Sequence, residues 1–89
     1  MAQSVYIGQI LIDDTVLSKI HDKHNLTFED VTTALQYPAK ARAAWEDHPT
    51  HGLRVVAYGT SWAGRAILGW LEAVDETDGT WRLRSARAA

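Results

Sequence analysis

Arginine is concentrated in the second half of the sequence, where it offers a set of permanent positive charges. The candidates for chemistry are Arg54, Arg65, Arg82, Arg84 and Arg87. A guanidinium group stays charged and binds phosphate through two parallel hydrogen bonds, so this set suits a phosphate-bearing ligand. Alternation along the last strand would put Arg82 and Arg84 on the face opposite to Arg87. The alternative is that these arginines are ordinary polar residues of a half-exposed sheet.

Histidine can accept or donate a proton near neutral pH, and two histidines are candidates for that task. His24 ends the first predicted helix, and His48 lies in the loop before the central strands. The alternative for a histidine at a helix end is capping or packing. His21 with His24, and His48 with His51, also form two His-x-x-His pairs. Structural zinc usually draws on cysteine and on a longer histidine spacing, so we predict no metal site and no cofactor.

The first third of the chain predicts a short strand followed by a helix. Residues 5–12 hold an apolar, β-branched run that favours a strand entering the core. Asp13 and Asp14 then supply an N-cap and a negative first turn for a helix with apolar residues on one face. Asn25 is a suitable end for that helix, because Asn tolerates the left-handed conformation that ends many helices.

A second helix start is the clearest local signal in the sequence. Thr27 is the expected N-cap, and Asp30 occupies the capping-box position three residues later. Apolar residues follow at helical spacing, and Pro38 stops the helix because the residue before a proline is disfavoured in helical conformation. We predict a helix over residues 28–36.

The remainder of the chain predicts strands joined by tight turns. The strand segments cover residues 41–45, 53–59, 65–74 and 81–87. Residues 60–64 connect the central hairpin, and Asp78-Gly79 is a dipeptide typical of turns. We therefore predict an α+β fold in which a short N-terminal strand and two helices pack on one face of a three- to four-stranded antiparallel sheet.

Four tryptophans provide large apolar surfaces for a short chain. Trp70 and Trp81 fall in predicted strands, and we predict that they belong to the core. Trp45 and Trp62 are the better candidates for an exposed binding surface.

Composition limits the classes of protein that the chain can belong to. With 89 residues, 46% of them hydrophobic, it suits one folded domain over residues 1–89. The absence of cysteine excludes disulfides and a cysteine nucleophile. The start shows no signal-peptide pattern and no segment has the length of a membrane span, so we expect a cytoplasmic protein. A net charge of −2 means that any contact with nucleic acid has to come from a local basic patch.

Three stretches, taken together, resemble the BrnT family of bacterial type II toxins. Residues 23–30 read Lys-His-Asn-Leu-Thr-Phe-Glu-Asp and are similar to the junction between the family's helices, with Asn25 where Gly is usual. Residues 54–60, with the following Gly64-Arg65, are similar to its arginine, apolar strand and Gly-Arg hairpin. Residues 82–89 are similar to its last, arginine-containing strand. The stretches occur in the family's order and span nearly the whole chain.

The resemblance implies a RelE-like fold and an mRNA-cleaving toxin that inhibits translation and that a cognate antitoxin holds inactive. Its RNA target is either free or associated with the ribosome. Metal-independent RNA cleavage needs a base, an acid and a cation that stabilises the developing phosphorane charge. On this basis the predicted catalytic residues are His24, His48, Arg65 and Arg87. The predicted RNA-binding residues are Arg54, Arg82 and Arg84.

The alternative function is a non-catalytic protein-interaction module on the same scaffold, in effect a degenerate toxin. The net negative charge favours it, as does the end of the sequence two residues after Arg87, where RelE-like toxins commonly continue with a basic or aromatic tail. A homodimer formed by pairing of sheet edges is a further expected partner arrangement, because an open sheet exposes unpaired backbone groups. No membrane partner is expected.

Overall fold

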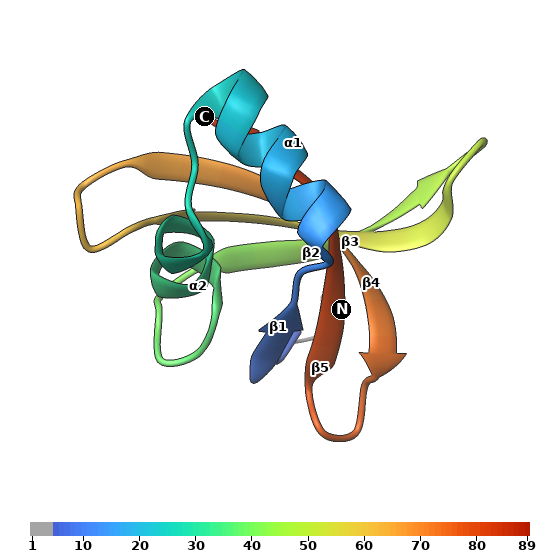
Figure 1. The fold of residues 1–89 in the computed structure, drawn as a ribbon. Coiled ribbons are helices and arrows are strands. Elements are labelled where there is room, and N and C mark those ends of the chain that lie inside the picture. Colours follow the sequence, from blue (N-terminus) through green and yellow to red (C-terminus); the bar gives the residue numbers. More distant parts are fainter. Residues whose placement is uncertain (1–4) are drawn as a thin grey trace.

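A computed structural model describes residues 5–89 and shows two helices against one sheet (Figure 1). The helices are α1 (Asp14–His24) and α2 (Phe28–Leu35). The strands are β1 (Gln9–Leu11), β2 (Arg42–His48), β3 (Gly52–Thr60), β4 (Ala66–Asp75) and β5 (Thr80–Ala88). The α+β prediction is confirmed. None of the helices in the described part of the chain has the length and apolar character needed to cross a membrane.

The sheet is larger than predicted and is mixed. Its five strands lie in the order β1-β5-β4-β3-β2. The last four form the expected antiparallel meander, but β1 lies beside β5 and runs parallel to it. The prediction of three to four antiparallel strands was therefore wrong, because it did not include the parallel pairing of β1 with β5. Connecting two parallel strands requires a long crossover, and here α1, α2 and the rest of the meander supply it.

Strand β2 continues further than its apolar residues indicated. The predicted strand ended at Trp45, whereas the observed strand also includes Glu46, Asp47 and His48. These polar residues pair with β3, where Glu46 stands opposite Arg54. Glu46 and His48 lie on the face of the sheet that carries no helix, and Asp47, on the other face, is exposed, so all three polar side chains are tolerated.

The predicted start of α2 and end of α1 are confirmed, whereas Asp13 occupies the N-cap position of α1 without a side-chain capping hydrogen bond. Thr27 Oγ1 accepts a hydrogen bond from the Asp30 N–H at 3.1 Å, and Asp30 Oδ2 accepts from the Thr27 N–H at 3.0 Å. Both bonds of a capping box are therefore present. Asn25 ends α1 with φ 54°, in the left-handed region that its sequence position suggested.

The core lies between the helices and one face of the sheet. Helix α1 packs against β5, and α2 packs against β3 and β4. The largest completely buried side chains are Leu26, Val31, Leu35, Val55, Ile67, Leu71 and Leu83. The opposite face of β2–β5 has no helix, and we call it the outer face. The predicted packing of both helices on one face is confirmed.

The predicted burial of the four tryptophans is correct for Trp81 and Trp62 and wrong for Trp45 and Trp70. Trp81 is buried, as predicted, and its indole N–H donates to the Tyr6 carbonyl at 2.8 Å. Trp62 is 85% exposed, also as predicted. Trp45 was predicted to be exposed but is half-buried, with its ring centre 5.5 Å from that of Trp81. Trp70 was predicted to be in the core but is half-buried on the outer face, opposite Ser85.

Strand β5 contains a bulge that changes which side chains share a face. Trp70 pairs with Ser85, but the next residue, Leu71, pairs with Leu83, so Arg84 is an extra residue in β5. The simple alternation predicted for this strand was therefore wrong. The bulge places Arg82, Arg84 and Arg87 together on the outer face, where alternation alone would have separated them.

Candidate functional site

The four residues predicted to be catalytic are not brought together. Arg65 reaches back to the backbone of His24 at the end of α1, on the helix side of the sheet. His48 and Arg87 belong to strands β2 and β5, which are separated by β3 and β4. A single catalytic centre formed by all four side chains is not compatible with this arrangement.

Arg65 has a set of contacts that accounts for its position without substrate. Its guanidinium donates to the carbonyls of Asn25 and His24 at 2.5 and 3.2 Å, and to Asp30 Oδ2 at 3.2 Å. These bonds tie the start of β4 to the connection between the helices. The Asp30 carboxylate therefore serves both the capping box and this ion pair.

His48 shapes the turn between β2 and β3. Its Nδ1 atom accepts hydrogen bonds from the backbone N–H groups of Thr50 and His51, both at 3.1 Å. The ring centres of His48 and His51 are 4.6 Å apart. With Nδ1 used in the turn, His48 fixes the position of His51, and His51 is the histidine that lines a cavity beside Arg54 and Arg84.

The arginines of the outer face are interleaved with two glutamates. Arg54 Nε donates to Glu46 Oε1 at 2.7 Å. Glu72 Oε1 lies 3.5 Å from Arg84 Nη1 and 3.9 Å from Arg82 Nη1. Exposed ion pairs of this kind contribute only about 0–1 kcal/mol, so a phosphate group can compete for an exposed guanidinium such as that of Arg84. Arg82 and Arg84 are thus held in place by exchangeable partners, whereas the Arg54 side chain is only 16% exposed and keeps its short bond to Glu46.

Trp70 lies among these cations and orients two of them. The guanidinium carbons of Arg54 and Arg87 lie 5.8 and 5.5 Å from the centre of its ring. Both distances are within the range of a cation–π interaction. A half-buried Trp70 therefore has a role on this face that its strand position alone did not suggest.

A cavity of about 190 Å³ opens on the outer face beside this cluster. It is lined by His51, Arg54, Glu72, Arg84 and Ser85. An imidazole, a carboxylate and two guanidinium groups thus share one concave space, where a proton acceptor, a proton donor and stabilising cations can act on the same ligand. We call these five residues the outer-face cavity.

The sequence identified the cations of this cavity but not its imidazole and carboxylate groups. His51 entered only as half of a His-x-x-His pair, and Glu72 was not singled out. Glu72 sits on the outer face by its register opposite Arg82, and apart from the terminal Asp75 it is the only charged residue of β4. That isolated charge between Leu71 and Ala73 was the signal that could have found it.

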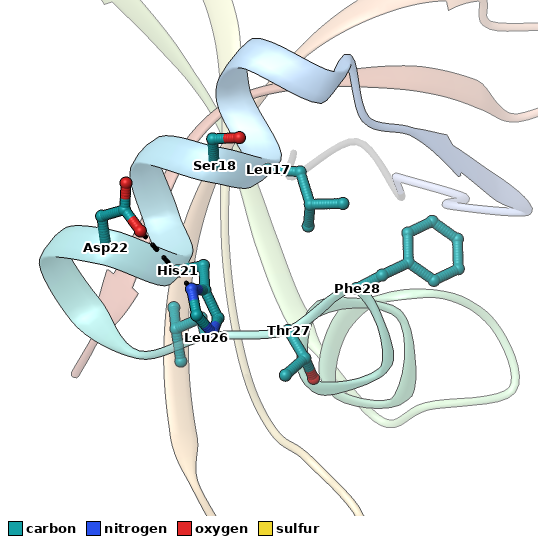
Figure 2. Close-up of a pocket in the computed structure, with 7 residues that line it drawn as sticks. All are labelled: Leu17, Ser18, His21, Asp22, Leu26, Thr27 and Phe28. Carbon is teal, nitrogen blue, oxygen red and sulfur yellow. Dashed lines mark ion pairs between the residues drawn. The ribbon is translucent and has the colours of Figure 1, made fainter.

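A second hollow lies between the helices and differs in character. Leu17, Leu26 and Phe28 line it together with Ser18, Thr27, His21 and Asp22 (Figure 2). His21 Nδ1 and Asp22 Oδ1 lie 3.5 Å apart on α1. No arginine lines this hollow, so it lacks the cations that a phosphate-bearing ligand requires.

Residues 5–89 include no group of three or more histidine, cysteine, aspartate or glutamate side chains arranged to hold a metal ion. Comparison of the chain with protein-family models and with curated proteins finds no match.

Proposed function

We propose that the chain is the toxin of a type II toxin–antitoxin pair, a metal-independent endoribonuclease that inhibits translation by cleaving mRNA. The observation that carries the proposal is the outer-face cavity, in which His51 and Glu72 lie beside Arg54 and Arg84. The resemblance of residues 23–30, 54–60 with 64–65, and 82–89 to the BrnT family supports it. Two helices on one face of the β2–β5 meander also fit the RelE-like scaffold that the proposal includes.

The proposed reaction is cleavage by the neighbouring 2′-hydroxyl of the RNA. Glu72 takes the proton of that hydroxyl, and the 2′-oxygen forms a bond to phosphorus. The bond from phosphorus to the 5′-oxygen breaks, and His51 gives a proton to the leaving oxygen. Arg54 and Arg84 stabilise the charge that develops on the non-bridging oxygens. The products are a 2′,3′-cyclic phosphate and a 5′-hydroxyl, and no metal ion enters the balance.

The other outer-face arginines extend the proposed site beyond the cleaved bond. Arg82 shares Glu72 with Arg84, and Arg87 lies over Trp70, as Arg54 does. In this proposal they contact neighbouring phosphates of one strand. The predicted RNA-binding role of Arg54, Arg82 and Arg84 is kept, and Arg87 joins them as a binding residue. The partner that neutralises the toxin is a cognate antitoxin protein.

The test is cleavage of a single-stranded RNA by the purified protein in the presence of a chelator. We expect cleavage with a 2′,3′-cyclic phosphate end, and a loss of about 100-fold in rate for His51→Ala. His21→Ala is the matched control, because His21 is exposed on α1 at the hollow between the helices. Absence of cleavage by the folded native protein, with or without ribosomes, would reject the enzyme proposal.

A second candidate function, a non-catalytic protein-interaction module, is favoured by the aromatic surface around α2. Trp62 and Tyr37 are 85% and 64% exposed, and both line a groove of about 290 Å³ with Thr33 and Pro38. Induced expression in a bacterial host separates the two functions. Growth arrest by the native chain supports the toxin, provided that the arrest is relieved when Arg82, Arg84 and Arg87 are all changed to Ala. Normal growth with soluble native protein supports the interaction module.

A further inference from the structure

The two edges of the sheet differ in how their backbone groups are used. At the β1 edge, the Ile10 N–H donates to Gln36 Oε1 at 2.9 Å, and the Ile7 carbonyl accepts from the Tyr37 N–H at 2.7 Å. At the other edge, β2 pairs only with β3 among the described residues. The seven residues of β2 therefore present one side of their backbone without a partner in this part of the chain. An edge of this length is a template for pairing with another strand.

The outer-face side chains of β2 have a charge pattern that is complementary to that of a second, antiparallel copy of the same strand. Arg42, Ala44 and Glu46 alternate along that face, with the small Ala44 at the centre. Two antiparallel copies related by a two-fold axis at Ala44 would place Arg42 of each copy opposite Glu46 of the other. On the helix side the same register sets Ala43 opposite Trp45, a small residue against a large one. Cross-strand pairs of opposite charge stabilise such an arrangement.

Other registers lack this match. A continuous sheet requires that paired residues point to the same face, so the two-fold axis moves in steps of one residue along the strand. Centring on Trp45 would place Arg42 opposite His48, and centring on Glu46 would place two carboxylates opposite each other. Only the Ala44 register forms two symmetry-related Arg42–Glu46 pairs within the strand.

Both members of that pair have capacity for a new contact. Arg42 is exposed and makes no ion pair within residues 5–89. Glu46 uses Oε1 for Arg54, and its Oε2 accepts no hydrogen bond from any described residue. The outer pair can therefore form without breaking the contact that holds Arg54.

We propose that the chain forms a homodimer through antiparallel pairing of β2 with β2 of a second copy, with the two-fold axis at Ala44. The two sheets become continuous, and both outer faces lie on the same side. The outer-face cavity remains open in each copy, because its residues come from the β2–β3 turn, β3, β4 and β5. The proposed dimer therefore neither requires nor blocks the proposed ribonuclease activity.

Sedimentation equilibrium of the native chain tests the assembly. We expect twice the 9.9 kDa mass of one chain. Arg42→Glu should raise the dimer dissociation constant about tenfold, since each interface loses two pairs and gains two repulsions. The double change Arg42→Glu with Glu46→Arg should restore pairing between copies. Within one strand these side chains are about 13 Å apart, so an intramolecular effect cannot produce that rescue.

Single cysteines test the register without altering charge at the pair. The natural chain has no cysteine, so Ala44→Cys introduces a single thiol. Residues facing each other across an antiparallel pair have Cα atoms about 4.5–5.5 Å apart, within the range of a disulfide. Asp47→Cys is the matched control, because its two copies would be about 20 Å apart.

We expect a disulfide-linked dimer from Ala44→Cys and none from Asp47→Cys. A native protein that sediments as a monomer would overturn the proposal. A dimer in which Asp47→Cys links as well as Ala44→Cys would overturn the register. Circular dichroism of each variant establishes that it is folded before either result is used.

Discussion

Arg87 lies over the ring of Trp70, with its guanidinium carbon 5.5 Å from the ring centre. Unlike Arg54, it forms no ion pair with any carboxylate within the described residues. The aromatic ring orients the cation without neutralising it. Of the outer-face cations, Arg87 is therefore among those most available to a phosphate.

Removing Arg87 should weaken RNA binding in a salt-dependent way. Each phosphate contact with a single strand contributes about 0.7 to the slope of log affinity against log salt concentration. We expect Arg87→Ala to reduce the slope by that amount, measured by fluorescence anisotropy with a 2′-deoxy oligonucleotide that cannot be cleaved. Lys19→Ala is the matched control, because it removes the same charge from the exposed side of α1. Equal effects of both changes would contradict a specific role for the outer face.

Arg65 should contribute to stability, in contrast to its predicted catalytic role. Arg65→Ala removes the donors to Asn25, His24 and Asp30 and leaves the Asp30 carboxylate without its cation. We expect the free energy of unfolding to fall by about 2 kcal/mol. Urea unfolding followed by circular dichroism measures this. Arg84→Ala is the comparison, because an exposed arginine should change stability by no more than about 0.5 kcal/mol.

A fully stable Arg65→Ala protein that had lost RNA cleavage would contradict this assignment. It would return Arg65 to the catalytic role that the Gly64-Arg65 resemblance suggested. Arg65→Lys adds a second comparison, since an ammonium group keeps the charge but cannot contact all three acceptors through a planar fork.

Features set by neighbouring residues were predictable from the sequence. The capping box of Thr27 and Asp30, the end of α1 at Asn25 and the turn at Gly79, with φ 71°, all depend on local conformation. The same holds for the strands of the meander, whose observed bounds differ by a few residues from the predicted ones. Short-range hydrogen bonding and backbone preference determine these elements.

Features set by pairing across the sheet were not predictable. The extra residue Arg84 in β5 has no glycine or proline to mark it, yet it decides that Arg82 and Arg87 share a face. Trp70 and Trp81 both look like core residues when each strand is considered alone. Only the strand register shows that Trp81 faces the core and Trp70 the outer face. The cavity followed from that register, so the sequence did not single out Glu72, the carboxylate that lines it.

The backbone of α2 approaches β3 closely at Gly59, and this packing of the helix on the sheet can be tested. A Cβ atom at Gly59 would overlap the Ala34 carbonyl oxygen, which belongs to the helix backbone and cannot rotate away. At Gly69 the Cβ would lie 2.7 Å from Leu35 Cδ1, the end of a flexible side chain. We expect Gly59→Ala to cost about 3 kcal/mol and Gly69→Ala about 1 kcal/mol in thermal or urea unfolding. Equal costs would contradict the close contact between the α2 backbone and Gly59.

Glu72 provides the sharpest test of the proposed chemistry. Glu72→Gln keeps the shape of the side chain but removes the proton acceptor from the outer-face cavity. We expect the single-turnover cleavage rate to fall about 100-fold. Affinity for the 2′-deoxy oligonucleotide should stay equal or increase, because the change removes a negative charge from the face that is proposed to bind phosphate. Glu29→Gln is the matched control, since it makes the same change at an exposed position of α2 that does not line the cavity.

The combination of variants distinguishes a wrong role from a wrong site. If His51→Ala loses cleavage while Glu72→Gln retains it, the cavity is correct and the proton acceptor is another group on the enzyme or a water molecule. If both variants cleave at the native rate, the outer-face cavity is not the catalytic site, even if the protein is a ribonuclease. A fall in rate for Glu72→Gln with unchanged binding is the result that assigns the carboxylate to the chemical step, because loss of a purely binding residue would lower affinity instead.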